Sequence, residues 1–176
     1  MSLPVSAHKA TGRRVAFARR ARITSAERFQ AGERLAATLL PLLRDARRVA
    51  AYVALADEPP TALLLAARPD VLLPVLLPGG DLDWQIGLDG PAVGVDTIAD
   101  CDLVLVPAVA VDRTGVRLGR GGGSYDRALS RAVGLTIALL YDDELVDRLP
   151  CETHDRAVDA VATPRDGVVR LPVGEY

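Results

Sequence analysis

The segment from Asp112 to Arg127 carries residue types that suit phosphate binding. Four of the five residues from 119 to 123 are glycine, which can bring the main chain close to a ligand and adopt left-handed conformations. Free backbone N–H groups in such a loop bind anions, especially where the loop leads into a helix. Arg117 and Arg120 add planar guanidinium groups that match phosphate oxygens. These features predict an anion-binding loop.

A carboxylate follows the loop, because Asp126 falls in the first turn of the next predicted helix. A carboxylate beside bound phosphate is a common ligand for Mg²⁺. The alternative is an ordinary glycine-rich turn whose acid complements the helix dipole. The residue types alone leave both interpretations open. The loop is not of the Walker type, since that motif needs a lysine and the only lysine of the chain is Lys9.

Hydrophobic periodicity predicts alternating helices and strands around this loop. Thr24 and Glu27 have the spacing of a capping box, which marks the start of a helix. The apolar, valine-rich run from Asp102 to Ala110 is typical of a central strand. We expect helices over 5–20, 24–43, 61–67 (with Thr61 as its N-cap), 124–132 and 142–148, and strands over 48–55, 71–77, 82–88, 102–110, 135–141, 157–162 and 168–171.

This alternation predicts a layered α/β fold with a mostly parallel sheet. Ligands of such sheets bind outside the C-terminal ends of the strands. We therefore expect the functional site among the loops that follow Leu55, Ala110 and Tyr141.

The composition fits one domain over residues 1–176 and excludes several classes of partner. Lys and Arg (21) nearly balance Asp and Glu (23), and aromatic residues make up 4%, so no nucleic acid is expected. No apolar run reaches the roughly 18 residues of a membrane-spanning helix, so no membrane is expected. Cys101 and Cys151 form no disulfide framework, which suits the cytoplasm. We expect a monomer, since no heptad seam is present.

The N-terminal segment is basic, and residues 1–22 contain no acid. The favoured interpretation is the solvated face of a helix. An organelle transit peptide is the alternative, because such peptides are rich in arginine and poor in acids.

The letters from Asp112 to Arg127 resemble the signature of the 5-formyltetrahydrofolate cyclo-ligase family, D-x-x-G-x-R-L-G-x-G-x-G-x-Y-D-R. Residues 106–110 resemble the V-P-x-x-A strand end that precedes this signature. Three further segments match in the order of the family: the K-x-x-x-R pair at 9–13, the Y-x5-E-x2-T segment at 52–61, and the late L-P-x-E-x-H-D at 149–155.

The resemblance implies a fold, a reaction and a set of site residues. The fold is a three-layer α/β/α arrangement of the NagB/RpiA/CoA-transferase-like type. The reaction is the conversion of 5-formyltetrahydrofolate to 5,10-methenyltetrahydrofolate, with Mg²⁺ as cofactor and ATP as co-substrate, releasing ADP and phosphate. The implied ATP-binding residues are Lys9, Arg13, Arg117, Leu118, Gly119, Arg120, Gly121, Gly122, Gly123, Ser124 and Tyr125. The implied folate-binding residues are Val53, Glu58, Arg120, Gly121, Gly122, Gly123 and Ser124, and the implied metal ligands are Asp126 and Asp155.

Other interpretations remain open at individual positions. Without the resemblance, Glu58 before two prolines would be a solvated loop acid, and Asp155 would be a turn cap. Ser124 stands where the family usually has an aromatic residue, and the segment from Trp84 to Asp102 is short. A relative that only binds ATP or folate is therefore the main alternative function, and an isomerase or CoA-transferase-like enzyme on a related fold is a third.

Overall fold

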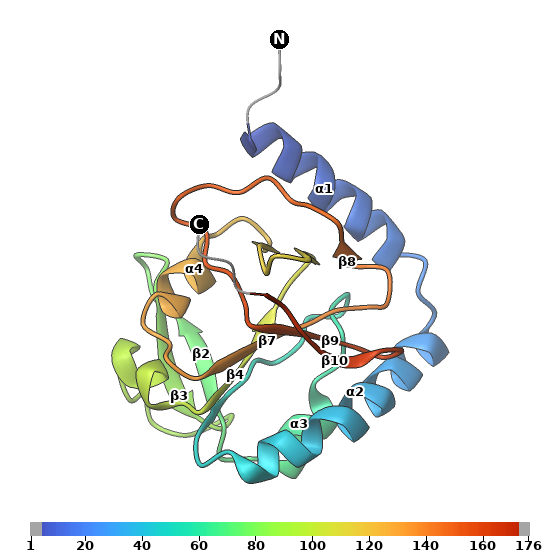
Figure 1. The fold of residues 1–176 in the computed structure, drawn as a ribbon. Coiled ribbons are helices and arrows are strands. Elements are labelled where there is room, and N and C mark those ends of the chain that lie inside the picture. The colour runs from blue at the N-terminus through green and yellow to red at the C-terminus, as the bar shows by residue number, and fades with distance from the viewer. Residues whose placement is uncertain (1–4, 173–176) are drawn as a thin grey trace.

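The central element of the computed structural model, which describes residues 5–172, is a seven-stranded sheet in the order β10-β9-β7-β4-β1-β2-β3 (Figure 1). Its strands from β9 to β2 are parallel, and β10 and β3 pair antiparallel at the two edges. This confirms the expected α/β fold with a mostly parallel sheet. The strands are β1 Val49–Ala50, β2 Leu72–Leu76, β3 Leu82–Ile86, β4 Leu103–Pro107, β7 Leu135–Leu139, β9 Ala160–Thr163 and β10 Gly167–Arg170.

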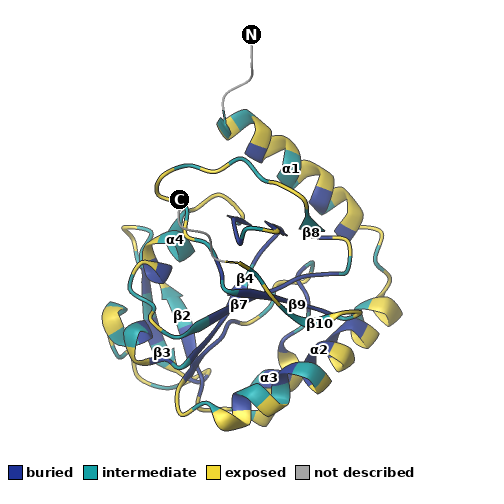
Figure 2. Ribbon diagram, in the orientation of Figure 1, coloured by how far each residue is buried: buried dark blue, intermediate teal, exposed yellow. Residues whose placement is uncertain are grey.

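The middle strand β4 is buried on both faces of the sheet. Leu103 and Leu105 belong to one buried hydrophobic cluster, and Val104 and Val106 belong to another. Successive side chains of a strand point to opposite faces, so a strand buried on both faces is apolar throughout. Figure 2 shows the inner strands buried and the outer faces of the helices exposed.

One face of the sheet is covered by α2 Ser25–Asp45 and α3 Ala62–Ala67. Leu35, Leu39 and Leu43 of α2 are fully buried at helical spacing against the strands. The predicted capping box is confirmed at the start of α2. The Thr24 hydroxyl accepts from the Glu27 N–H at 3.3 Å, and the Thr24 N–H donates to Glu27 Oε2 at 2.8 Å.

The opposite face is covered by α4 Ser124–Leu129, the 3-10 helix η1 Val95–Asp100 and a small second sheet of β6 Arg117–Leu118, β5 Ala110–Asp112 and β8 Leu145–Val146. Helix α1 Val5–Arg20 packs on this small sheet through Ala16 and Phe17 and lies beside β8 in Figure 1. The fold thus has a middle sheet with elements on both sides. The finer NagB/RpiA/CoA-transferase-like class stays a prediction.

Two predicted strands are shorter than expected for identifiable reasons. The strand expected over 48–55 ends at Ala50, because side chains take over its backbone groups: the Thr61 hydroxyl bonds Tyr52 O and Ala54 N–H, and Glu58 accepts from Leu55 N–H. Thr61 stands at the predicted N-cap position of α3, but its hydroxyl makes no capping bond. The strand expected over 102–110 stops at Pro107, and the chain re-enters the small sheet as β5.

The helix predicted over 142–148 is wrong. These residues form a turn followed by β8, which pairs parallel with β5. The Glu144 carbonyl accepts from Val111 N–H at 3.0 Å, and the Glu144 carboxylate accepts from Tyr141 N–H at 2.9 Å. These tertiary hydrogen bonds replace those that a helix would have made.

The interpretation of the basic N-terminal segment as a solvated helix face needs correction. Residues 5–20 form the predicted helix α1, but Lys9 and Arg20 are buried. Arg20 bonds both oxygens of the Glu144 carboxylate, at 2.6 and 2.8 Å, and also bonds Ala108 O. Residues 1–4 lie outside the described part of the chain. Within that part, no helix has the length and apolar character needed to cross a membrane.

Candidate active site

A pocket of about 720 Å³ lies between α1, the loops after β1 and β4, and the segment 152–155. All fifteen residues expected at the site line it: Lys9, Arg13, Val53, Glu58, Asp155 and residues 117–126. These residues come from distant parts of the chain, so the fold itself brings them together. Of the three loops expected to form the site, those after Leu55 and Ala110 line this pocket, and Tyr141 does not.

The glycine loop has a conformation that its sequence requires. Gly121 has φ +109° and Gly123 has φ +68°, values that favour glycine. Arg13 donates through Nε to the Gly119 carbonyl at 2.7 Å, which joins α1 to the loop. Within residues 5–172, no hydrogen bond engages the N–H groups of residues 121–123. These donors are available to an anion in the pocket.

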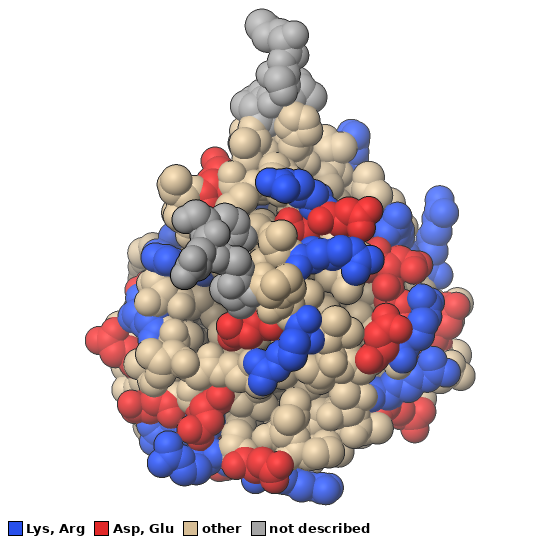
Figure 3. Space-filling view, in the orientation of Figure 1, with Lys and Arg blue, Asp and Glu red and all other residues tan. Residues whose placement is uncertain are grey.

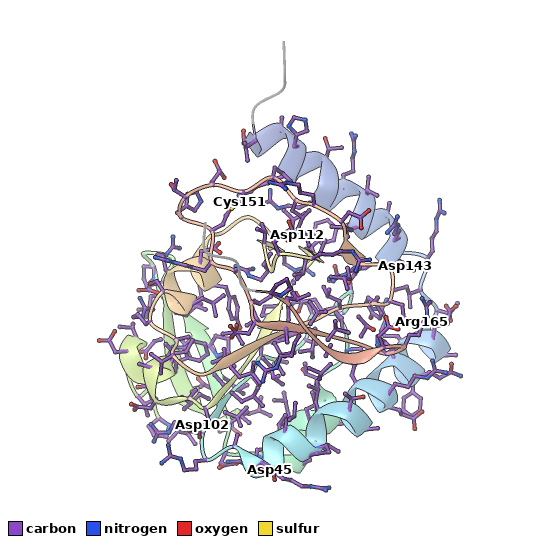
Figure 4. The ribbon with its side chains drawn as sticks, viewed as in Figure 1. Asp45, Asp102, Asp112, Asp143, Cys151 and Arg165 are labelled. Carbon is purple, nitrogen blue, oxygen red and sulfur yellow. The ribbon has the colours of Figure 1, made fainter. Side chains whose placement is uncertain are left out.

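Asp112, the first residue of the signature, is buried and its carboxylate joins two loops by hydrogen bonds. Its carboxylate accepts from the N–H groups of Thr114 and Val116, which shapes the turn between β5 and β6. Its other oxygen accepts from Leu149 N–H at 2.9 Å. In Figure 4 the loop that carries Cys151 passes between α1 and the turn that carries Asp112. Asp112 therefore positions both the glycine loop and the loop of Asp155.

Lys9 is buried against two carboxylates. Its ammonium group lies 2.6 and 2.8 Å from the two oxygens of Asp155 and 2.8 Å from Glu152 Oε2. Burial disfavours the charged form of Lys9, but the hydrogen bonds to Asp155 and Glu152 outweigh it and raise the Lys9 pKa. Burial likewise opposes ionisation of Asp155, but the hydrogen bonds from Lys9 and from Glu152 N–H lower its pKa. Both groups are charged at neutral pH.

Arg117 and Asp126 form a second ion pair inside the pocket. Arg117 Nη2 donates to Asp126 Oδ1 at 2.8 Å, and the Arg117 side chain is almost fully buried. The same oxygen accepts from the backbone N–H of Arg156 at 3.3 Å. Because Arg156 follows Asp155 directly, the two carboxylates predicted to hold a metal lie at the same side of the pocket.

Glu58 is not a solvated loop acid, since it is only 4% exposed. Arg120 donates through Nε to Glu58 Oε1 at 2.9 Å and through Nη2 to Asp57. The other Glu58 oxygen holds Leu55 N–H. The Tyr141 hydroxyl donates to the Glu58 carbonyl at 3.0 Å, so the loop after β7 supports the site although it does not line the pocket.

These contacts divide the site into three internal ion pairs: Lys9 with Asp155, Arg117 with Asp126, and Arg120 with Glu58. Each pair joins a cation expected at the ATP phosphates to a carboxylate expected at the metal or the folate. Within each pair, the cation and the carboxylate neutralise each other in this structure. A bound phosphate would therefore compete with the carboxylates for the same cations. On the face shown in Figure 3, basic and acidic side chains are similarly intermixed.

A second hollow of about 710 Å³ adjoins the first and has a mostly apolar lining. Val53, Leu55 and Leu88 line both hollows and are more than half exposed. Large apolar side chains that remain exposed beside a pocket are typical of a binding surface. Leu88 comes from the short segment between Trp84 and Asp102, which therefore still contributes an apolar wall.

Several pocket residues were missed in the expected set. Glu152 bonds Lys9, and the largely exposed His154 ring lies 3.8 Å from Asp155 and 3.9 Å from Glu152. Tyr52 lines the pocket beside Val53. Tyr52, Glu152 and His154 all belong to the motif segments quoted above, so the signal was present. Leu55 and Leu88 carry no motif, and only the fold reveals them.

The donor set of this pocket fits a hard divalent cation. Ligand atoms of Glu152, His154 and Asp155 lie within 4.8 Å of one another, and Asp126 adjoins them through Arg156 N–H. Mg²⁺ prefers carboxylate oxygens, which three of these residues supply. The Lys9 ammonium contacts the carboxylate oxygens that would bind a metal. In this structure the positive charge of Lys9 therefore takes the place of the metal charge.

Comparisons with known proteins agree with the motif and the fold. Residues 5–164 match the model of the 5-formyltetrahydrofolate cyclo-ligase family. The chain is 39% identical to the 5-formyltetrahydrofolate cyclo-ligase of Mycolicibacterium smegmatis, over 85% of this chain and 90% of that protein. It is 30% identical to the enzyme of the same name from Haemophilus influenzae, over 77% and 87% of the two chains. The NMR structure of Aquifex aeolicus 5,10-methenyltetrahydrofolate synthetase is similar to it with a TM-score of 0.79 and 27% identity, over 96% of this chain and 95% of that one. The chain belongs to the 5-formyltetrahydrofolate cyclo-ligase family.

Proposed function

We propose that this protein is a ligase that converts 5-formyltetrahydrofolate to 5,10-methenyltetrahydrofolate with ATP and Mg²⁺, releasing ADP and phosphate. The observation that carries the proposal is that one pocket joins a glycine loop with free N–H groups, four cationic side chains and the buried acid Glu58. The loop and the cations suit phosphates, and Glu58 with its apolar neighbours suits a folate.

The chemistry needs activation, because an amide-like formyl oxygen is a poor leaving group. In the proposed reaction this oxygen attacks the terminal phosphorus of ATP, and the bond from that phosphorus to ADP breaks. N10 of the folate then attacks the activated carbon, and the new N10–C bond closes the ring. The carbon–oxygen bond breaks, phosphate leaves with the former formyl oxygen, and N10 loses its proton.

The protein contributes position and charge to this reaction. Arg13, Arg117, Arg120 and the loop N–H groups bind the phosphates. Lys9 exchanges its carboxylate partners for phosphate oxygens. Asp126 and Asp155 would hold Mg²⁺, which when bound neutralises charge on the transferring phosphoryl group.

The folate side of the pocket depends on Glu58 and its neighbours. When a phosphate takes Arg120, the Glu58 carboxylate is left to accept from N–H donors of the pterin ring. Val53 then packs against the ring at the mouth of the pocket. The location in the cytoplasm and the monomeric state stay predictions.

A turnover assay tests the proposal. The purified protein is mixed with Mg²⁺, ATP and 5-formyltetrahydrofolate, and the near-ultraviolet absorbance band of the methenyl product is followed. We expect an ATP-dependent increase of this band. Asp126→Asn should lower turnover about tenfold or more by weakening metal binding. The matched variant Asp147→Asn should leave it unchanged, since that side chain is 95% exposed.

Two results would contradict the proposal. No band with ATP still bound, measured by calorimetry, would favour a protein that only binds nucleotide. Equal turnover in the wild-type protein and Asp126→Asn would remove Asp126 from the metal site.

A further inference from the structure

Two tyrosines of the pocket have buried hydroxyl groups that find no hydrogen-bond partner among residues 5–172. They are Tyr52 and Tyr125, both of which line the pocket. A buried hydroxyl without a partner is unfavourable, and most buried polar groups in proteins are bonded. Tyr125 was already expected at the ATP. Tyr52 has no role in the proposed reaction.

The position of Tyr52 is fixed by its backbone. It follows β1 by two residues, and its carbonyl accepts from the Thr61 hydroxyl at 2.8 Å. The residue is only 3% exposed. Burial raises the Tyr52 pKa well above its ordinary value, and the nearby Glu58 carboxylate raises it further. The hydroxyl therefore keeps its proton at neutral pH and can donate it in a hydrogen bond.

A second tyrosine provides the contrast. Tyr141 is also buried, and its hydroxyl accepts from Arg28 at 3.2 Å and donates to the Glu58 carbonyl at 3.0 Å. The fold thus gives hydrogen-bond partners to the Tyr141 hydroxyl, beneath the Glu58 loop, and leaves the Tyr52 hydroxyl at the pocket unsatisfied. A phenylalanine at position 52 would fill the same space without an unsatisfied group, so the hydroxyl needs another explanation.

Tyr52 and Glu58 together offer one donor and one acceptor. The carboxylate of Glu58 accepts from N–H groups, and the hydroxyl of Tyr52 donates to an oxygen. A pterin ring presents this complementary pair along its lactam edge, where an N–H lies next to a carbonyl. Arg117 and the N–H groups of the glycine loop, on the Tyr125 side, are donors suited to phosphate.

We propose that the Tyr52 hydroxyl donates a hydrogen bond to the lactam carbonyl of the bound tetrahydrofolate, beside the Glu58 carboxylate. The inference rests on the proposed function. Because the hydroxyl is covered in this structure, the contact requires side chains of the pocket to shift when ligands bind. Tyr52 is then a specificity residue for the pterin and not for ATP.

The test compares Tyr52→Phe with Tyr141→Phe, which removes the same atom from a bonded tyrosine. Thermal unfolding is measured for the free proteins, and calorimetry gives the affinities for 5-formyltetrahydrofolate and for ATP. We expect Tyr52→Phe to unfold no earlier than the wild-type protein and to bind the folate about three- to tenfold more weakly, as expected for one lost hydrogen bond. Its ATP affinity should not change. Tyr141→Phe should unfold at a lower temperature.

A modified ligand isolates the carbonyl. A tetrahydrofolate analogue with sulfur in place of the lactam oxygen keeps the neighbouring N–H but accepts hydrogen bonds only weakly. Tyr52→Phe should therefore lose much less affinity for this analogue, relative to the wild-type protein, than for 5-formyltetrahydrofolate. Unchanged affinity of Tyr52→Phe for 5-formyltetrahydrofolate, or an equally large loss of affinity for the sulfur analogue, would overturn the inference alone. Failure of the wild-type protein to bind 5-formyltetrahydrofolate would overturn the proposed function and the inference with it.

Discussion

Replacing Lys9 by Met should destabilise the protein and at the same time increase its response to Mg²⁺. The Lys9 ammonium makes three short contacts with Asp155 and Glu152, and the Lys9 and Asp155 side chains are both buried. Breaking a fully buried pair costs about 3–5 kcal/mol. Here Asp155 keeps its bond from Glu152 N–H and Glu152 is partly exposed, so we expect about 2 kcal/mol, in the range of a charged hydrogen bond.

The expected loss is large enough to measure by calorimetry. In a chain of this length, 1 kcal/mol shifts the unfolding temperature by roughly 2–4 °C, so Lys9→Met should unfold about 4–8 °C lower. Arg14→Met is the matched control, because Arg14 lies exposed on the same helix. Its unfolding temperature should match that of the wild-type protein.

The effect of Mg²⁺ on the unfolding temperature tests whether Lys9 and the metal compete for the same carboxylates. In Lys9→Met the oxygens of Asp155 and Glu152 no longer face an ammonium, so Mg²⁺ without ATP should bind better and raise the unfolding temperature more than in the wild-type protein. An equal or smaller Mg²⁺ effect in Lys9→Met would refute the idea that Lys9 and the metal compete for the same carboxylates. An unchanged unfolding temperature without metal would refute the stabilising role of the pair.

Two further substitutions test the framework around the site. Arg20→Met should cost about 3–5 kcal/mol in urea denaturation, because it leaves Glu144 buried without its partner, whereas Arg47→Met breaks only an exposed pair. Equal losses would contradict the importance of burial. Gly123→Ala should cost about 1–2 kcal/mol, since φ is +68° there, whereas Gly79→Ala meets no neighbour within 4 Å and should be neutral. A neutral Gly123→Ala would show that the loop conformation is not fixed by glycine.

Most of the site could be predicted because its chemistry is concentrated in a few segments with characteristic spacing. The glycines, Arg117, Arg120 and Asp126 lie within one short stretch, and in the structure Lys9, Glu58 and Asp155 line the same pocket. The pairing of these groups could not be predicted. Lys9 and Asp155 are 146 residues apart, and such a contact depends on the whole fold.

The strand and the helix that were predicted wrongly also depend on contacts that the fold makes. Residues 48–55 have the pattern of a strand, but Thr61 and Glu58 bind the backbone after Ala50 and divert it towards the pocket. Residues 142–148 have a helical pattern, but Glu144 turns inward to Arg20. In both cases a polar side chain from a distant or neighbouring segment outweighs local propensity. The first departure lies at the site, since Tyr52, Val53 and Leu55 line the pocket.

Transfer of the formyl oxygen tests the central claim most directly. The protein is given ATP, Mg²⁺ and 5-formyltetrahydrofolate labelled with ¹⁸O at the formyl oxygen, and the released phosphate is analysed by mass spectrometry. Phosphorylation of that oxygen predicts one labelled oxygen in the phosphate for each methenyl product formed. Unlabelled phosphate accompanying methenyl product would contradict the account.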